Sequence, residues 1–115
     1  MAVIETSENS SNLALQTHYY KASYEQIKNR YLEIIEGMNH KVVSVNDDYT
    51  EIYSEIPHMT VIAKIIMQDP LETSIDFEIH AEYLMGNNKK ALKFIEKVLK
   101  MIEEKYEFKG VSLHK

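Results

Sequence analysis

The chain has 115 residues, of which 44% are hydrophobic and 27% are charged, and these values are ordinary for one globular domain. It contains no cysteine, which excludes a disulfide framework, a cysteine-ligated zinc or iron–sulfur site and a thiol nucleophile. The net charge of −5 argues against binding to double-stranded nucleic acid, because that binding depends on cations that contact phosphates.

Charge is distributed unevenly along the chain. Residues 1–87 hold five basic and 14 acidic side chains, whereas residues 88–115 hold eight basic and four acidic ones. We interpret the C-terminal segment as a basic element that complements an acidic body, with a site for an anion or an acidic partner as the alternative. Neither a membrane-spanning run nor a signal-peptide pattern is present, so we expect a cytoplasmic protein with no membrane contact.

The N-terminal part of the chain predicts a tail, a strand and a helix. Small polar residues predict a disordered N-terminal tail over residues 1–12. Apolar and polar side chains alternate over residues 13–20, which indicates a first strand, with a helix as the alternative. Ser23 and Gln26 have the spacing of a capping box. Apolar residues then recur every three or four positions, which predicts a helix that ends near Gly37.

The middle of the chain predicts an antiparallel hairpin followed by two further strands. An Asn46-Asp47-Asp48 cluster marks the first turn, and Pro57 marks the break before the next strand because proline cannot donate to a ladder. The segment 59–67 is apolar on both faces, as in a central strand, and the segment after it alternates most clearly. The four predicted strands cover residues 42–45, 49–56, 59–67 and 73–83.

The last element is a second amphipathic helix, predicted from the apolar stripe over residues 91–106 and ended by Gly110. Residues 111–115 are expected to form a short tail, so a single domain covers residues 13–110. The predicted fold is α+β with two layers: a curved, five-stranded antiparallel sheet and two helices on one of its faces, in the order β-α-β-β-β-β-α.

This element order resembles one repeat of the TATA-binding-protein-like fold, and it is similar to small uncharacterised archaeal proteins of that topology. The resemblance covers about residues 13–106 and rests on element order, and the bias toward Ile, Tyr, Lys and Glu fits a thermophilic archaeal source. In that family, basic and aromatic residues of the open sheet face contact DNA. Here that face carries carboxylates, so no DNA-binding role is carried over. The carboxylates are those of Glu51, Glu55, Asp76, Glu78 and Glu82.

One set of side chains on the predicted sheet suggests a metal. Asp76, Glu78 and His80 share one face of a strand, and His18 would join them from the first strand if the two strands were neighbours. Histidine with carboxylates binds Zn²⁺, and carboxylates alone bind Mg²⁺ or Mn²⁺. A metal-dependent enzyme is therefore one hypothesis, and a solvated strand face is the simpler interpretation that we favour.

A non-enzymatic binding module without a cofactor is our leading hypothesis. Tyr49 and Tyr53 share the open sheet face with Ile62 and Ile66, which favours a homodimer contact over stacking with single-stranded RNA bases, because acidic residues lie between them. The alternative is a pocket between the sheet and the C-terminal helix that takes a small apolar or anionic ligand. Methionines at 38, 59, 67, 85 and 101 fall at predicted core positions, and a filled core is the simpler interpretation because methionine commonly fills irregular gaps.

Overall fold

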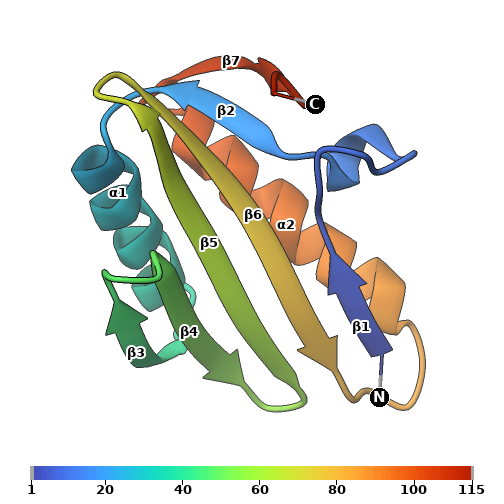
Figure 1. Ribbon diagram of the computed structural model, residues 1–115. Helices are drawn as coiled ribbons and strands as arrows, with labels where there is room; N and C mark the ends of the chain where they lie inside the picture. The colour runs from blue at the N-terminus through green and yellow to red at the C-terminus, as the bar shows by residue number, and fades with distance from the viewer. Residues whose placement is uncertain (1, 115) are drawn as a thin grey trace.

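The centre of the fold is a long hairpin in which β5 (Met59–Asp69) pairs antiparallel with β6 (Glu72–Ala81). The computed structural model describes residues 2–114 (Figure 1). β4 (Glu51–Ile56) pairs with β5, and β3 (Lys41–Asn46) pairs with β4, again antiparallel. The predicted hairpin over residues 42–56 and the two strands predicted after it are therefore confirmed.

Two short strands share the other side of β6. β1 (Ala2–Glu5) pairs with the end of β6, and β2 (His18–Lys21) pairs with its beginning. β7 (Glu107–Val111) continues the sheet beyond β2. Over the described residues the sheet thus has seven strands, in the order β3-β4-β5-β6-β2-β7 with β1 beside β6, and the prediction of five strands is wrong.

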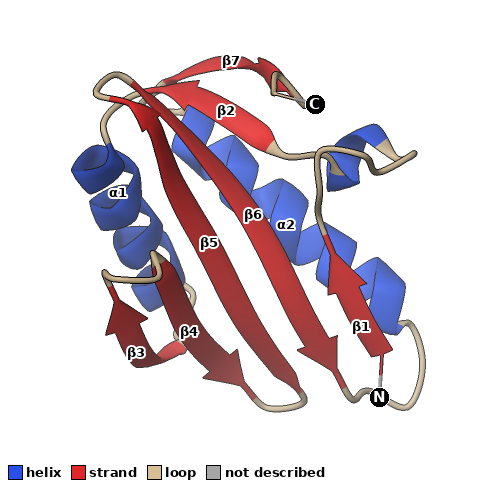
Figure 2. Ribbon diagram, viewed as in Figure 1, coloured by secondary structure: helices blue, strands red, loops and turns tan. Residues whose placement is uncertain are grey.

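Both helices, α1 (Tyr24–Gly37) and α2 (Asn87–Glu103), lie behind the sheet in the view of Figures 1 and 2. Their apolar stripes meet the sheet in an aromatic contact, in which the ring of Phe77 on β6 lies 6.1 Å from Tyr31 of α1 and 6.2 Å from Phe94 of α2. The α+β arrangement with helices on one face is as predicted, and the other face of the sheet carries no helix. Neither described helix has the length and hydropathy needed to cross a bilayer.

The first helix begins and ends where it was predicted to. The Gln26 amide donates to the Ser23 hydroxyl at 3.2 Å, and the Ser23 amide donates to the Gln26 side chain at 2.9 Å, which completes the capping box. Gly37 is the last helical residue, but it does not take the left-handed conformation that often follows a helix. Asn39 takes it, with φ of 63°, because the short polar side chain of asparagine tolerates that region.

The N-terminal prediction needs correction. Residues 1–12 were expected to form a tail, but Ala2–Glu5 form β1, and the Thr6 amide donates to the Phe77 carbonyl at 2.9 Å. Four residues are too few to show the alternation of apolar and polar side chains that predicts a strand. In the structure, β1 pairs with β6, and Ile4 is buried in the core. The predicted strand over residues 13–20 divides into the 3₁₀ helix η1 (Leu13–Leu15) and β2.

The C-terminal prediction needs correction as well. The last helix stops at Glu103, and Gly110, which was expected to end it, lies inside β7. The strand forms because the ring of Phe108 packs 5.8 Å from Tyr20 and 5.4 Å from His18, a contact with the far end of the sequence. A strand whose stability comes from such a distant partner has no local signature.

The start of α2 is left without a side-chain cap. Gly86 occupies the N-cap position with φ of 74° and makes no side-chain hydrogen bond to the helix. The Asn87 side chain accepts a hydrogen bond from the Tyr83 amide instead, at 2.8 Å. The first turn contains no acidic residue. This helix N-terminus, with its free amides, therefore keeps its partial positive charge.

Candidate functional site

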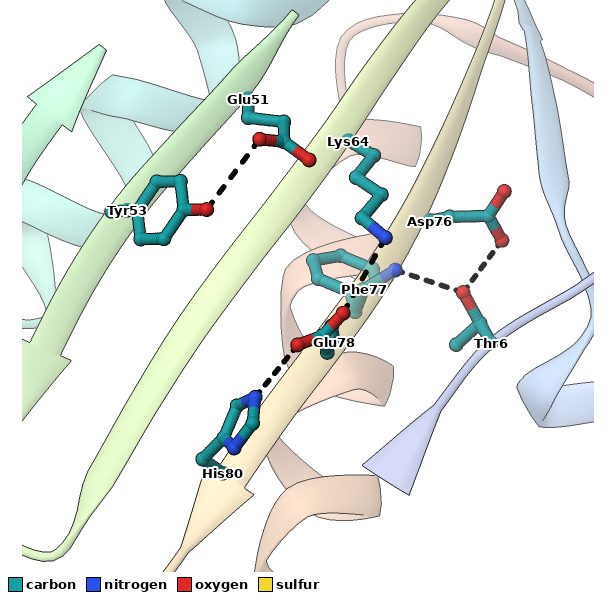
Figure 3. A network of polar contacts seen from close by, with 8 residues as sticks. All are labelled: Thr6, Glu51, Tyr53, Lys64, Asp76, Phe77, Glu78 and His80. Carbon is teal, nitrogen blue, oxygen red and sulfur yellow. Dashed lines mark hydrogen bonds and ion pairs between the residues drawn. The ribbon is translucent and has the colours of Figure 1, made fainter. Parts of the chain in front are cut away.

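The face of the sheet without helices carries a polar network along β6, which Figure 3 shows from close by. Glu78 accepts a hydrogen bond from the His80 ring at 2.7 Å and pairs with the Lys64 ammonium at 3.5 Å. The His80 hydrogen bond, with the charge of Lys64 behind it, holds the pKa of Glu78 below its ordinary value. This carboxylate is thus ionised and already engaged by the protein.

Asp76 lies at the junction where the edge of β6 passes from β1 to β2 (Figure 3). It accepts hydrogen bonds from the hydroxyls of Thr6, at 2.6 Å, and Thr17, at 2.8 Å. The Thr6 hydroxyl in turn accepts from the Phe77 amide at 2.8 Å. Burial raises the pKa of Asp76, and the two threonine hydrogen bonds oppose that rise. These hydrogen bonds connect β6 to the residue after β1 and the residue before β2, so Asp76 has a structural role.

The four residues predicted to hold a metal are not brought together. His18 lies opposite Ile75, which faces the core, so its side chain is on the helix side of the sheet, whereas Asp76, Glu78 and His80 are on the other side. The His18 Nδ1 atom lies 2.7 Å from the Gln16 carbonyl oxygen. Among residues 2–114, no group of three or more His, Cys, Asp or Glu side chains is placed to hold a metal ion.

The four residues predicted for a dimer contact differ in how much surface they offer. Tyr49, in the β3–β4 turn, is 74% exposed, and Ile66 is 43% exposed. Tyr53 is half-buried, and its hydroxyl lies 3.5 Å from Glu51 (Figure 3). Ile62 lies between Tyr53 and Glu78 on the neighbouring strands and is only 8% exposed. The surface available for a contact is therefore concentrated at the Tyr49 and Ile66 end.

A different arrangement lies on the helix side of the sheet, where α2 begins. A pocket of about 250 Å³ opens there between the end of α1, the β4–β5 turn, the loop after β6 and the first turns of α2. Apolar side chains make up most of it, and lysines of α2 border it. The lining residues are Met38, His40, Ile56, Met59, Tyr83, Lys90, Lys93, Phe94 and Lys97.

The three lysines of this pocket are exposed to solvent. Lys90, Lys93 and Lys97 are spaced by three and four residues, so they lie along one side of α2. The Lys90 ammonium lies 4.0 Å above the ring of Tyr83, a cation–π contact. Within residues 2–114, none of the three forms an ion pair, whereas Lys28, Lys41, Lys64, Lys105 and Lys109 all do.

His40 is the buried polar residue of the pocket. It is 9% exposed, and its ring stacks on Phe94 at a centroid distance of 5.0 Å and an angle of 27°. Its Nδ1 atom is buried and has no hydrogen-bond partner among the described residues. Burial lowers the pKa of His40, so the ring is neutral at pH 7. A buried polar atom without a partner costs about 1–3 kcal/mol, which a suitable ligand group would offset.

The sequence pointed to this region without identifying its polar residues. The five methionines were expected at core positions. Met59 is buried and Met38 and Met101 pack against the core, whereas Met67 and Met85 are exposed, and Met38 and Met59 also line the pocket. The lysines were interpreted as part of a basic C-terminal segment, and His40 was not selected. Their spacing on the border of the apolar stripe was the available signal, but only the fold places His40 beside them.

No family model, curated protein or solved structure matches this chain. The likeness to the TATA-binding-protein-like fold and an archaeal source therefore stay predictions.

Proposed function

We propose that this protein is a small binding module that holds an organic anion with an apolar body in the pocket between the sheet and α2. The observation that carries the proposal is the convergence of three lysines without ion-pair partners above an apolar floor. Charged side chains that the fold does not use for its own stability are candidates for binding a ligand. An enzymatic role requires reacting groups that this pocket does not bring together.

The electrostatics of α2 favour an anion at this place. Lys90 follows the helix N-terminus by one turn, and both contribute positive potential. The helix terminus contributes about 0.3–1 kcal/mol to an anion placed near it, and each exposed ion pair contributes about 0.2–1 kcal/mol. Both contributions weaken with salt, because the Debye length shrinks from about 10 Å at 0.1 M to about 3 Å at 1 M.

The apolar part of the pocket limits the size of the ligand. Its volume of about 250 Å³ lies below the range of about 300–1,000 Å³ that is usual for ligand pockets. Met38, Ile56, Met59 and Phe94 supply apolar surface, and each buried CH₂ group of a ligand gains about 0.8 kcal/mol there. These dimensions favour a short ligand over a long acyl chain.

A titration followed by NMR tests the proposal, with benzoate and hexanoate as anionic probes and benzyl alcohol as a neutral one. We expect amide shifts centred on residues 38–40, 56–59, 83 and 90–97, with affinity for the anions above that for the alcohol and falling with salt. The double variant Lys93→Gln/Lys97→Gln should bind the anions about 2–30-fold more weakly, from two exposed ion pairs.

The matched control is Lys89→Gln/Lys100→Gln, which removes the same charge from α2 outside the pocket lining. This variant should keep most of the affinity. Equal losses in the two double variants, or equal affinity for benzoate and benzyl alcohol, would contradict a specific anion site.

Self-association through the open sheet face is a second candidate function. It is favoured by the exposed side chains of Tyr49 and Ile66, which are 74% and 43% exposed. The Ile65 amide donates to the Thr50 carbonyl at 3.0 Å, so the β3–β4 turn lies beside this end of β5. A two-fold contact would place the same patch against itself.

Sedimentation velocity at micromolar concentration tests this second candidate. A dimer should dissociate in the variant Ile66→Glu and persist in Leu84→Glu, which changes a fully exposed leucine in the loop before α2. A monomer at all concentrations would exclude the contact.

A further inference from the structure

The loop between β6 and α2, residues 82–86, carries the two most exposed large hydrophobic side chains among residues 2–114. Leu84 is fully exposed and Met85 is 78% exposed, whereas no other large hydrophobic residue exceeds 74%. This loop and the β5–β6 turn lie at opposite ends of the sheet (Figure 1). An apolar pair that projects into water costs hydrophobic free energy, and contact with an apolar medium would remove that cost.

The fold holds this loop in place at both of its ends. The Glu82 amide donates to the His58 carbonyl at 2.8 Å, and the Tyr83 amide donates to the Asn87 side chain at 2.8 Å. The centroid of the Tyr83 ring lies 5.6 Å from that of His58 and 4.0 Å from the Lys90 ammonium. The apolar pair therefore projects from an ordered base, and a contact made by it does not have to order the loop first.

Lysines follow the apolar pair directly. Residues 82–93 contain one acidic and three basic side chains, and Lys89, Lys90 and Lys93 are exposed on the first two turns of α2. Lys90 borders the same hollow as the apolar pair. Acidic residues are favourable in the first turn of a helix because they complement its dipole, but α2 has lysines there and no acidic residue. This placement is unfavourable for the helix itself and suits contact with an anionic surface.

These features fit a lipid bilayer better than a protein partner. A stable protein interface buries roughly 800 Å² on each side, whereas two projecting side chains offer only a small tip. A bilayer accepts such a tip without a matching pocket, and its anionic headgroups attract lysines that lie beside the tip. The sequence predicted no membrane contact because no run of residues is long enough to span a bilayer, but attachment to the surface of a bilayer requires no such run.

We propose that this protein attaches reversibly to an anionic membrane surface, with Leu84 and Met85 inserted at the boundary between headgroups and acyl chains. Lys89, Lys90 and Lys93 contact the anionic headgroups around them. The two contributions act together, because a single apolar or electrostatic contact gives only marginal attachment. The proposal goes beyond the anion-binding function, which depends on the pocket between the sheet and α2 and does not use the apolar pair.

Co-sedimentation with vesicles tests the proposal, using phosphatidylcholine alone and phosphatidylcholine with about 30% phosphatidylserine, which supplies the anionic headgroup. We expect binding to the anionic vesicles only, and weaker binding at higher salt because salt screens the lysines. Leu84→Ser/Met85→Ser should bind about 10-fold or more weakly, because the inserted apolar groups are lost. Lys89→Gln/Lys90→Gln should bind about 30-fold more weakly, at about fivefold for each lysine near the surface.

The matched control is Met67→Ser/Leu71→Ser, which changes the same two residue types at the other end of the sheet, where they are 57% and 64% exposed. This variant should bind the anionic vesicles as the wild type does. The chain has no tryptophan, so Leu84→Trp gives a single fluorescent reporter. Its emission should shift to the blue on addition of anionic vesicles and be quenched by brominated lipid, whereas the emission of Leu71→Trp should not change.

The outcomes separate this proposal from the anion pocket. Wild-type binding in Leu84→Ser/Met85→Ser, or an absence of binding to anionic vesicles, would overturn membrane attachment. Equal binding to the two kinds of vesicle would contradict the role of the lysines. Binding that is lost in Lys93→Gln/Lys97→Gln but kept in both Leu84→Ser/Met85→Ser and Lys89→Gln/Lys90→Gln would place a headgroup in the pocket, which overturns attachment through the loop and leaves the anion-binding function standing.

Discussion

The two faces of this molecule differ in how far their charged side chains are paired within the protein. On the open face of the sheet, all four titratable side chains of β6 are paired within the protein. Glu72 binds Lys109 and His114, Asp76 binds two threonines, and Glu78 binds His80 and Lys64. At the start of α2, three lysines and the buried nitrogen of His40 have no such partner among the described residues.

This difference distinguishes the polar groups that stabilise the fold from those that are available to bind a ligand. Polar groups that satisfy one another rigidify a fold and leave little free energy for a ligand, whereas polar groups held without a partner favour whatever completes them. The face with more charged residues is therefore the weaker candidate for a site. The predictions below test whether the two regions respond to mutation as this comparison requires.

The largest effect is expected from Asp76→Ala. It leaves the buried hydroxyls of Thr6 and Thr17 without an acceptor, and each such group costs about 1–3 kcal/mol. We expect a loss of about 3 kcal/mol in the free energy of unfolding, measured with urea. Asp76→Asn keeps an acceptor and should lose about 1 kcal/mol. Equal midpoints for the two variants would show that the threonine contacts do not stabilise the junction.

Glu72→Gln is expected to have an intermediate effect. Glu72 is 6% exposed and accepts hydrogen bonds from Lys109 and His114, and these lower its pKa from the ordinary 4.5. Both partners are partly exposed, so we expect a loss of about 1 kcal/mol at pH 7. Because the folded pKa is lowered, this contribution is complete above pH 4.5 and is lost as the pH falls through the folded value.

The difference in stability between wild type and Glu72→Gln should therefore shrink in acid, which urea titrations at pH 7 and pH 3 would measure. A difference that grows on acidification contradicts the sign. Lys21→Gln is a suitable control, because this exposed lysine of β2 forms no ion pair with a described residue.

A smaller effect is expected from His40 and appears as a pH dependence. Burial lowers its pKa in the folded state, so the folded protein favours the neutral ring. Stability from this group is complete above the unfolded value of 6.5 and is lost as the pH falls through the lower folded value. The variant His40→Phe should flatten the profile of thermal midpoint between pH 7.5 and pH 5. His58→Phe is the control and should retain the wild-type slope.

The smallest effect on stability is expected from Lys93→Gln/Lys97→Gln. Neither lysine pairs with a described carboxylate, so the free energy of unfolding should change by less than about 0.5 kcal/mol. The same variant is expected to lose affinity for benzoate, and that separation of stability from binding is the sharpest test of the comparison. A loss above about 1 kcal/mol would mean that these lysines stabilise the fold.

Local sequence patterns were enough to predict most elements of the fold. The capping box at Ser23 was readable because its two hydrogen bonds span only three residues. The hairpin around Asp47 was predictable because its strand residues and turn residues lie next to each other in the sequence. β1 and β7 were missed because they are short, and their stability comes from partners more than 70 residues away.

By itself, the sequence determined two amphipathic helices, the four central strands and the layer in which the helices lie, because periodicity and turn chemistry act over a few residues. Only the tertiary structure decided which charges are paired. Residues as distant as Thr6 and Asp76, or Glu72 and His114, meet through strand pairing that no local pattern specifies. The same holds for the pocket, where His40 and three lysines of α2 become neighbours because α1 and α2 pack on one face.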